Sequence, residues 1–203
     1  MKNLNIWMIV QSNNFKHIDN FNRVNQKTHV QYFPAIQSSE HYQIFSDFSV
    51  HKNYFHKHFV KQLESEPDAL GENLSHLLLF NNILEKSEHD WNLIIDGSIL
   101  MDVAKFTEQY ENILQITKET NCEFIQLYMP SKFFTTNNVQ KFSELNIYEL
   151  SIQVSTKVYL IHKNAINKFI NELPLKQSVL EHFGAMISSW KSLYWKNDCF
   201  QIM

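Results

Sequence analysis

The residues best placed to do chemistry follow the clearest core strand in the sequence. Residues 91–95 have the pattern of a buried strand, and Asp96-Gly97-Ser98 comes directly after them. In open α/β sheets, ligands bind at the carboxyl ends of the strands, so these polar residues stand where a ligand is expected. Gly97 lets the backbone turn sharply, and the Asp96 carboxylate could bind a divalent cation that neutralises a diphosphate. The alternative is that Asp96-Gly97 is simply a tight turn.

A second group of polar residues lies roughly twenty positions earlier in the chain. Ser75 and His76 interrupt a stretch over residues 70–84 whose other positions repeat apolar residues at helical spacing. Adjacent side chains on a helix do not face each other, so this pair does not form a hydrolase dyad. The alternative to a ligand-binding role is a serine and a histidine that bond to backbone at the edge of the core.

Alternating strand and helix patterns must position these two groups. A strand over residues 4–10, a helix over 16–26 and a strand over 30–33 form the opening of a doubly wound sheet. The later patterns predict helices over 70–84, 103–117, 163–172 and 178–190, and strands over 91–95, 123–128, 148–154 and 157–161. We therefore expect residues 1–203 to form a single α/β domain with a mostly parallel twisted sheet flanked by helices.

The composition excludes several classes of function. The net charge is −3 and Arg23 is the only arginine among 18 basic residues, which argues against a nucleic-acid partner. With three glycines, the chain carries neither a phosphate-binding loop nor a dinucleotide fingerprint. Cys122 and Cys199 predict free thiols in a reducing, cytoplasmic setting. No apolar stretch approaches the length of about 20 residues that a transmembrane helix needs.

Together these segments resemble glycosyltransferase family 25, which contains bacterial lipopolysaccharide and lipooligosaccharide glycosyltransferases and animal collagen galactosyltransferases. The family's Pro-Gly-Glu-Ile-Gly-Cys-x-Leu-Ser-His segment is similar to residues 67–76, which retain Pro67, Gly71, Leu74, Ser75 and His76. Its Leu-Ile-Leu-Glu-Asp-Asp segment corresponds to residues 93–98. Shorter similarities are Phe33-Pro34-Ala35-Ile36, the stretch from Thr156 to Ile161, and Ala165.

The resemblance implies an A-type glycosyltransferase fold and transfer of a sugar from a nucleotide-sugar to a bacterial surface glycan. UDP-sugar would be the donor, Mn²⁺ or Mg²⁺ a cofactor, and peripheral association with the inner membrane one form of localisation. Asp96 and Ser98 would then be catalytic, with Asp96 as the metal ligand. Ser75, His76 and Gly97 would bind the donor.

The chain departs from the family at the metal site. Gly97 and Ser98 stand where family members carry two aspartates, and a serine hydroxyl is a poor ligand for these cations. The family usually has basic residues after the first strand, whereas this chain has Gln-Ser-Asn-Asn at residues 11–14. Ala69 stands where the family has a glutamate. Glu181 is the nearest match to an acidic residue that the family carries later in the chain. The enzyme could be metal-independent, use other acids such as Asp102 or Asp198, or be a catalytically degenerate relative that binds a glycan or a protein. A chance match to an unrelated α/β module is the remaining alternative.

Two further segments have alternative interpretations. The aromatic-rich residues 42–59 would be the contact surface of a binding module, although a core helix with a loop explains them more simply. The same holds for His51, His56 and His58, for which surface or packing roles are expected rather than metal binding. The tail from Trp190 to Trp195 could pack on the domain or form dimer contacts.

Overall fold

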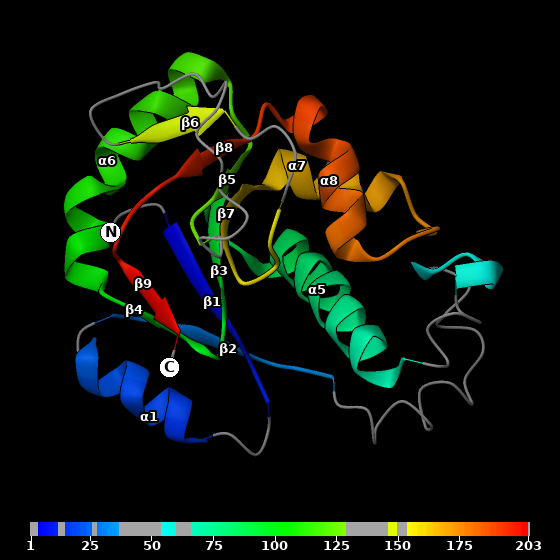
Figure 1. Ribbon diagram of the computed structural model, residues 1–203, viewed down its shortest axis with the longest axis horizontal. Helices are drawn as coiled ribbons and strands as arrows, with labels where there is room; N and C mark the ends of the chain where they lie inside the picture. Colours follow the sequence, from blue (N-terminus) through cyan, green and yellow to red (C-terminus); the bar gives the residue numbers. More distant parts are fainter. Residues whose placement is uncertain are drawn as a thin grey trace.

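Seven strands of the protein form one sheet in the order β2-β1-β3-β7-β5-β8-β6. The computed structural model describes residues 4–11, 15–25, 28–36, 54–59, 66–128, 146–149 and 154–202 (Figure 1). Strands β2, β1, β3, β5 and β8 run in the same direction, and only β7 and β6 of the seven run opposite to them. The sheet is therefore mostly parallel, as the sequence pattern predicted.

The first half of the sheet is built as a doubly wound unit. Its elements are β1 (Leu4–Val10), α1 (Phe15–Val24), β2 (Gln31–Pro34), α5 (Pro67–Lys86) and β3 (Trp91–Asp96). β1 pairs in parallel with both β2 and β3, and it is mostly apolar because helices cover both faces of the sheet. Their shared direction brings the carboxyl ends of β1, β2 and β3 to one edge of the sheet.

The second half of the chain adds the remaining strands, including the antiparallel ones, and the remaining helices. Its elements are β4 (Ile99–Met101), α6 (Val103–Thr120), β5 (Phe124–Gln126), β6 (Ile147–Glu149), β7 (Val158–His162), α7 (Lys163–Asn171), α8 (Val179–Trp190), β8 (Leu193–Trp195) and β9 (Phe200–Ile202). α6 begins at an Asp102 cap whose side chain accepts from the Lys105 amide, and it ends at Asn121 in the left-handed conformation.

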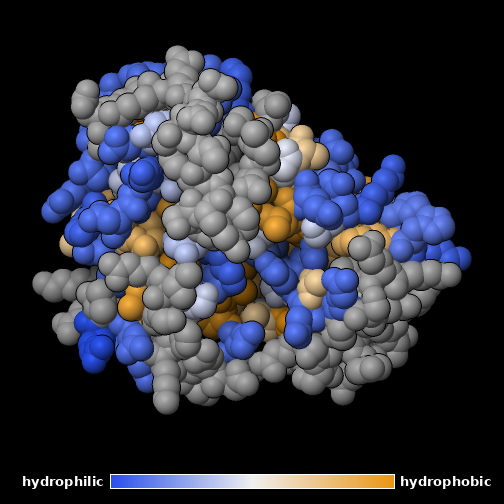
Figure 2. All heavy atoms as spheres, viewed as in Figure 1, coloured by the Kyte–Doolittle hydropathy of each residue, from blue (hydrophilic) through white to orange (hydrophobic). Residues whose placement is uncertain are grey.

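Helices cover both faces of the sheet and bury two apolar cores. α5, α7 and α8 lie on one side of the sheet, while α1 and α6 lie on the other (Figure 1). Phe80, Phe169 and Phe183 pack together in the first core, and Phe106 packs on Trp195 and Phe200 in the second. In the view of Figure 2, hydrophobic side chains are visible in the recessed centre of the molecular surface, with hydrophilic side chains around them.

Most of the predicted elements are present, with two corrections. The strand expected over 148–154 is the short β6, and residues 150–153 lie outside the described part of the chain. The tail forms β8 within the main sheet and β9 in a small second sheet with β4, where no strand was expected. Trp190 and Trp195 are buried, which agrees with packing on the protein's own core.

Other expectations concern single side chains. Cys122 and Cys199 are buried free thiols, as expected. His51 and residues 42–53 lie outside the described residues, whereas Phe55 and Phe59 of the aromatic segment are buried in the first core. His56 and His58 are exposed and their rings stack 5.4 Å apart. Among the described helices, none has both the length and the apolar character to cross a membrane.

Candidate functional site

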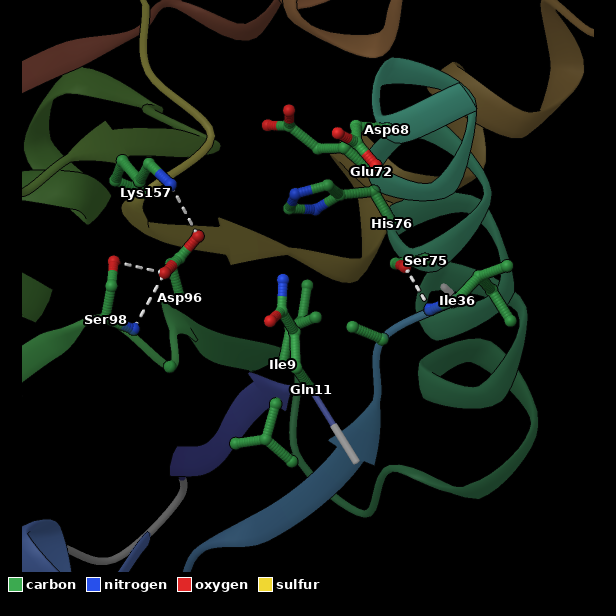
Figure 3. Close-up of a pocket in the computed structure, with 13 residues that line it drawn as sticks. Ile9, Gln11, Ile36, Asp68, Glu72, Ser75, His76, Asp96, Ser98 and Lys157 are labelled. Atoms are coloured by element: carbon green, nitrogen blue, oxygen red, sulfur yellow. Dashed lines mark hydrogen bonds and ion pairs between the residues drawn. The ribbon is translucent and has the colours of Figure 1, made fainter. Parts of the chain in front are cut away.

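A cavity of about 580 Å³ opens at the carboxyl ends of β1, β2 and β3, with α5 as its opposite wall. All five residues predicted for the site line this cavity, including Ser75 and His76 from α5. The full lining consists of Ile9, Val10, Gln11, Ala35, Ile36, Asp68, Glu72, Ser75, His76, Asp96, Gly97, Ser98 and Lys157 (Figure 3). The fold thus brings the two predicted groups of residues to one place, and the volume suits a small organic ligand.

Asp96 ends β3 with both carboxylate oxygens already bonded. Its Oδ1 accepts hydrogen bonds from the Ser98 amide, at 2.8 Å, and from the Ser98 hydroxyl. Its Oδ2 lies 2.7 Å from the Nζ of Lys157. Burial raises the pKa of Asp96, but the hydrogen bonds from Lys157 and Ser98 outweigh burial and hold the pKa below its usual value. Asp96 is therefore an ionised carboxylate paired with a lysine.

Lys157 reaches Asp96 because its backbone continues the pairing of β7 with β3. The Asp96 amide donates to the Lys157 carbonyl at 2.7 Å, one residue before β7 begins. Lys157 is thus held in register with the end of β3, and its side chain extends from there over the Asp96 carboxylate (Figure 3). The position of this cation depends on a strand that is distant in the sequence, which is why the sequence did not single it out.

Gly97 is a glycine because of close packing against β1. Its amide donates to the Ile9 carbonyl at 2.8 Å, and a Cβ on residue 97 would lie 2.8 Å from that same oxygen and 3.2 Å from a Val10 methyl group. Its φ is not positive, so the sharp turn expected from the sequence is not what requires a glycine here. An aspartate at this position, as in family 25, would force the end of β1 to move.

Ser75 is bonded to backbone on both sides. Its hydroxyl donates to the Gly71 carbonyl at 2.7 Å and accepts from the Ile36 amide at 2.8 Å. The side chain is 2 % exposed. Ser75 therefore holds the segment after β2 against α5, which is the structural alternative considered for it. A direct contact of Ser75 with a sugar donor stays a prediction.

His76 is buried beside the cavity in a pair with Tyr159 of β7. Its Nδ1 lies 2.8 Å from the Tyr159 hydroxyl. Burial lowers the pKa of His76 to about 4, with Lys157 acting in the same direction and the carboxylates of Glu72 and Asp96 opposing it. The imidazole is consequently neutral at pH 7.

Four residues at or behind the cavity wall were not predicted: Asp68, Glu72, Lys157 and Tyr159. Asp68, Glu72 and His76 are spaced four apart, so they form a polar stripe on one face of α5. Glu72 also accepts a hydrogen bond of 2.5 Å from the Thr156 hydroxyl. The stripe is a signal that the sequence contains, since three titratable residues recur at a spacing of four in the predicted helix.

The other candidate acids lie elsewhere. Asp102 caps α6, and Asp198 is exposed and pairs with Lys105 at 2.9 Å. Glu181 accepts from the Ser178 amide and hydroxyl at the start of α8. None of the three lines the cavity. The structure therefore places Asp102 and Asp198 away from the cavity that Asp96 lines.

The residues at this site do not fit a resident divalent cation. In the part of the chain that the structure describes, no group of three or more His, Cys, Asp or Glu side chains could hold a metal ion. Asp96 is a single carboxylate, and an ammonium group already occupies one of its oxygens. Mg²⁺ is usually held by one or two carboxylates together with substrate phosphates, whereas the carboxylate at the end of β3 is already paired with the ammonium group of Lys157.

Comparisons with known proteins match the fold and not the sequence. No protein-family model and no curated protein sequence matches the chain. Among solved structures, A197 from STIV is similar over 97% of this chain and 82% of its own, with 12% sequence identity and a TM-score of 0.50. A glycosyltransferase involved in the glycosylation of the major capsid of PBCV-1 is similar over 94% of this chain and 81% of its own, with 9% identity and a TM-score of 0.45.

Proposed function

We propose that this protein is a glycosyltransferase of the family 25 type that binds a UDP-sugar in the cavity without a resident divalent cation. The observation that carries the proposal is the ion pair of Lys157 with Asp96 at the carboxyl end of β3, where the family places its metal ligands. The cavity position and the motifs around Ser75 and Asp96 support it. The acceptor would be a bacterial surface glycan such as lipopolysaccharide.

In such a transfer, an acceptor hydroxyl oxygen bonds to the anomeric carbon of the sugar while the bond from that carbon to the diphosphate breaks. The diphosphate leaves with the bonding electron pair, and the hydroxyl proton passes to a base. Lys157 would stabilise the negative charge that develops on the leaving diphosphate. Glu72 and Asp68 are the carboxylates on the opposite wall that could accept the proton.

A second candidate is a catalytically degenerate relative that binds a sugar or glycan and does not transfer it. The charge of the cavity favours this candidate, since its lining carries three carboxylates and one ammonium, a net of two negative charges with His76 neutral. The net charge of such a lining disfavours a diphosphate, whereas the lining suits hydroxyl groups, which both donate and accept hydrogen bonds.

Calorimetric titration with a panel of UDP-sugars, followed by assay of sugar release or transfer, tests the two candidates. Binding with turnover that is lost in Asp96→Asn supports the transferase. Binding of a UDP-sugar or a glycan without turnover supports the second candidate. If no UDP-sugar binds, with or without Mn²⁺, the transferase proposal is overturned.

A further inference from the structure

The Tyr159 hydroxyl and His76 Nδ1 share a hydrogen bond of 2.8 Å, and its direction depends on the tautomer of His76. Tyr159 is fully buried, and within the described residues its hydroxyl has His76 Nδ1 as its hydrogen-bond partner. A buried O–H group needs an acceptor, and Nδ1 serves only if it is unprotonated. If Nδ1 carried the proton, the buried tyrosine would lose its acceptor. Tyr159 therefore donates to Nδ1.

The consequence for His76 follows from its charge. A neutral imidazole has one N–H group, so an unprotonated Nδ1 places the proton on Nε2. The groups that face the ring come from three elements: Glu72 on α5, Asp96 at the end of β3, and Lys157 before β7. The ring lines the cavity (Figure 3), and no hydrogen bond joins Nε2 to another described side chain. His76 thus offers one neutral donor to the cavity.

The two sides of the cavity differ in character. On α5, Asp68 and Glu72 present acceptors and His76 presents a donor, while Lys157 stands on the opposite side at the strand ends (Figure 3). A phosphate has only acceptors and negative charge, so the carboxylates of α5 repel it. A sugar hydroxyl both donates and accepts, and it matches a wall that combines carboxylates with a neutral N–H.

We infer that the α5 wall binds the sugar of the donor, with His76 Nε2–H donating to a sugar oxygen and Tyr159 acting as the positioning residue that holds this tautomer. The inference rests on the proposed function, because it divides the same cavity into a sugar side along α5 and a diphosphate side at Lys157. His76 is then a specificity-determining residue, since it distinguishes UDP-sugar from UDP.

The tautomer can be measured without any ligand, by the ¹⁵N chemical shifts of the His76 ring in long-range NMR spectra. We expect a protonated Nε2 in the unmodified protein and a mixture of tautomers in Tyr159→Phe, which keeps the ring packing on Phe124 and Phe183. Tyr194→Phe is the matched control, because Tyr194 is a buried tyrosine that does not line the cavity. A protonated Nδ1 in the unmodified protein would overturn the role of Tyr159.

Binding measurements test the sugar side. His76→Asn removes the donor at the Nε2 position, whereas His76→Gln retains an amide donor near it. We expect His76→Asn to weaken UDP-sugar about 3- to 10-fold and to leave UDP unchanged, with partial rescue in His76→Gln. An equal loss for UDP and UDP-sugar would show that the wall binds the nucleotide and would overturn the inference. Failure of the proposed function has a different signature, which is the absence of UDP-sugar binding by the unmodified protein.

Discussion

Lys157 and Asp96 are joined twice, once through the backbone and once through their side chains. The Asp96 amide donates to the Lys157 carbonyl at 2.7 Å, and the Lys157 Nζ lies 2.7 Å from Asp96 Oδ2. The backbone bond sets the register of β7 on β3, and the side-chain bond places an ammonium group beside the carboxylate at the end of β3. The same strand pairing therefore builds the sheet and equips the cavity with its cation.

An aspartate introduced at position 97 should destabilise the protein. In Gly97→Asp the new Cβ would approach the Ile9 carbonyl oxygen to 2.8 Å, so the end of β1 must shift. We expect a loss of about 1–3 kcal/mol in the free energy of unfolding, measured by urea denaturation. Gly184→Ala is the control, because a Cβ there meets nothing within 4 Å and the position is helical, so it should gain about 0.5–1 kcal/mol. An unchanged stability of Gly97→Asp would contradict the packing explanation.

Acid should destabilise the protein in a window that His76 defines. Burial lowers the pKa of His76 from 6.5 to about 4, so between these values the unfolded chain binds more protons at this position than the folded one. The free energy of unfolding should therefore fall as the pH falls from 6.5 to 4. Lowered pKa values at His162 and His182 act in the same direction, while the lowered pKa of Asp96 acts below pH 3.8.

Chemical denaturation at several pH values, compared between the unmodified protein and His76→Asn, isolates the contribution of His76. Between pH 6.5 and 4, the free energy of unfolding should fall less in the variant than in the unmodified protein, by on the order of 2–3 kcal/mol across the window. Two curves of identical slope would mean that His76 is not held neutral by burial.

Removing the Ser75 hydroxyl should loosen the attachment of the segment after β2. Ser75→Ala leaves the Ile36 amide without the acceptor that lies 2.8 Å away. Loss of a hydrogen-bond partner inside the protein lowers the free energy of unfolding by about 1–3 kcal/mol. Amide hydrogen exchange at Ile36 should become faster for the same reason. Ser189→Ala is the control, since Ser189 is exposed and its hydroxyl donates to the Met186 carbonyl within the same helix. Exchange at Ile36 that does not change would contradict the proposed role of Ser75.

The parts of the fold that the sequence predicts well are those with strong local patterns. β1 and β3 are continuous apolar runs and α5 is a long apolar helix, so their existence follows from nearby residues alone. β8 enters the main sheet through pairing with β5 and β6, and such pairing depends on residues far apart in the chain. The antiparallel insertion of β7 between β3 and β5 has the same origin.

The candidate site follows the same division. Asp96 and His76 were predicted because each stands out within its own segment, and the stripe of Asp68, Glu72 and His76 could also have been found by helical spacing. Lys157 could not, because its contact with Asp96 spans 61 positions and depends on strand register. Gly97 was expected to allow a sharp turn of the backbone, but the close approach of β1 is what requires a glycine at this position.

Lys157 is proposed to supply the charge that a metal ion would otherwise provide, and titration of a UDP-sugar in the presence of a chelator checks this role. The unmodified protein should bind equally well with EDTA and with Mn²⁺. Lys157→Met should bind about 10- to 100-fold more weakly in both, because it loses a charged hydrogen-bond donor. Lys168→Met should bind normally, since Lys168 is a lysine of similar exposure that pairs with Glu123 outside the cavity. Binding that requires Mn²⁺ in the unmodified protein, or that is unaffected in Lys157→Met, would contradict the claim.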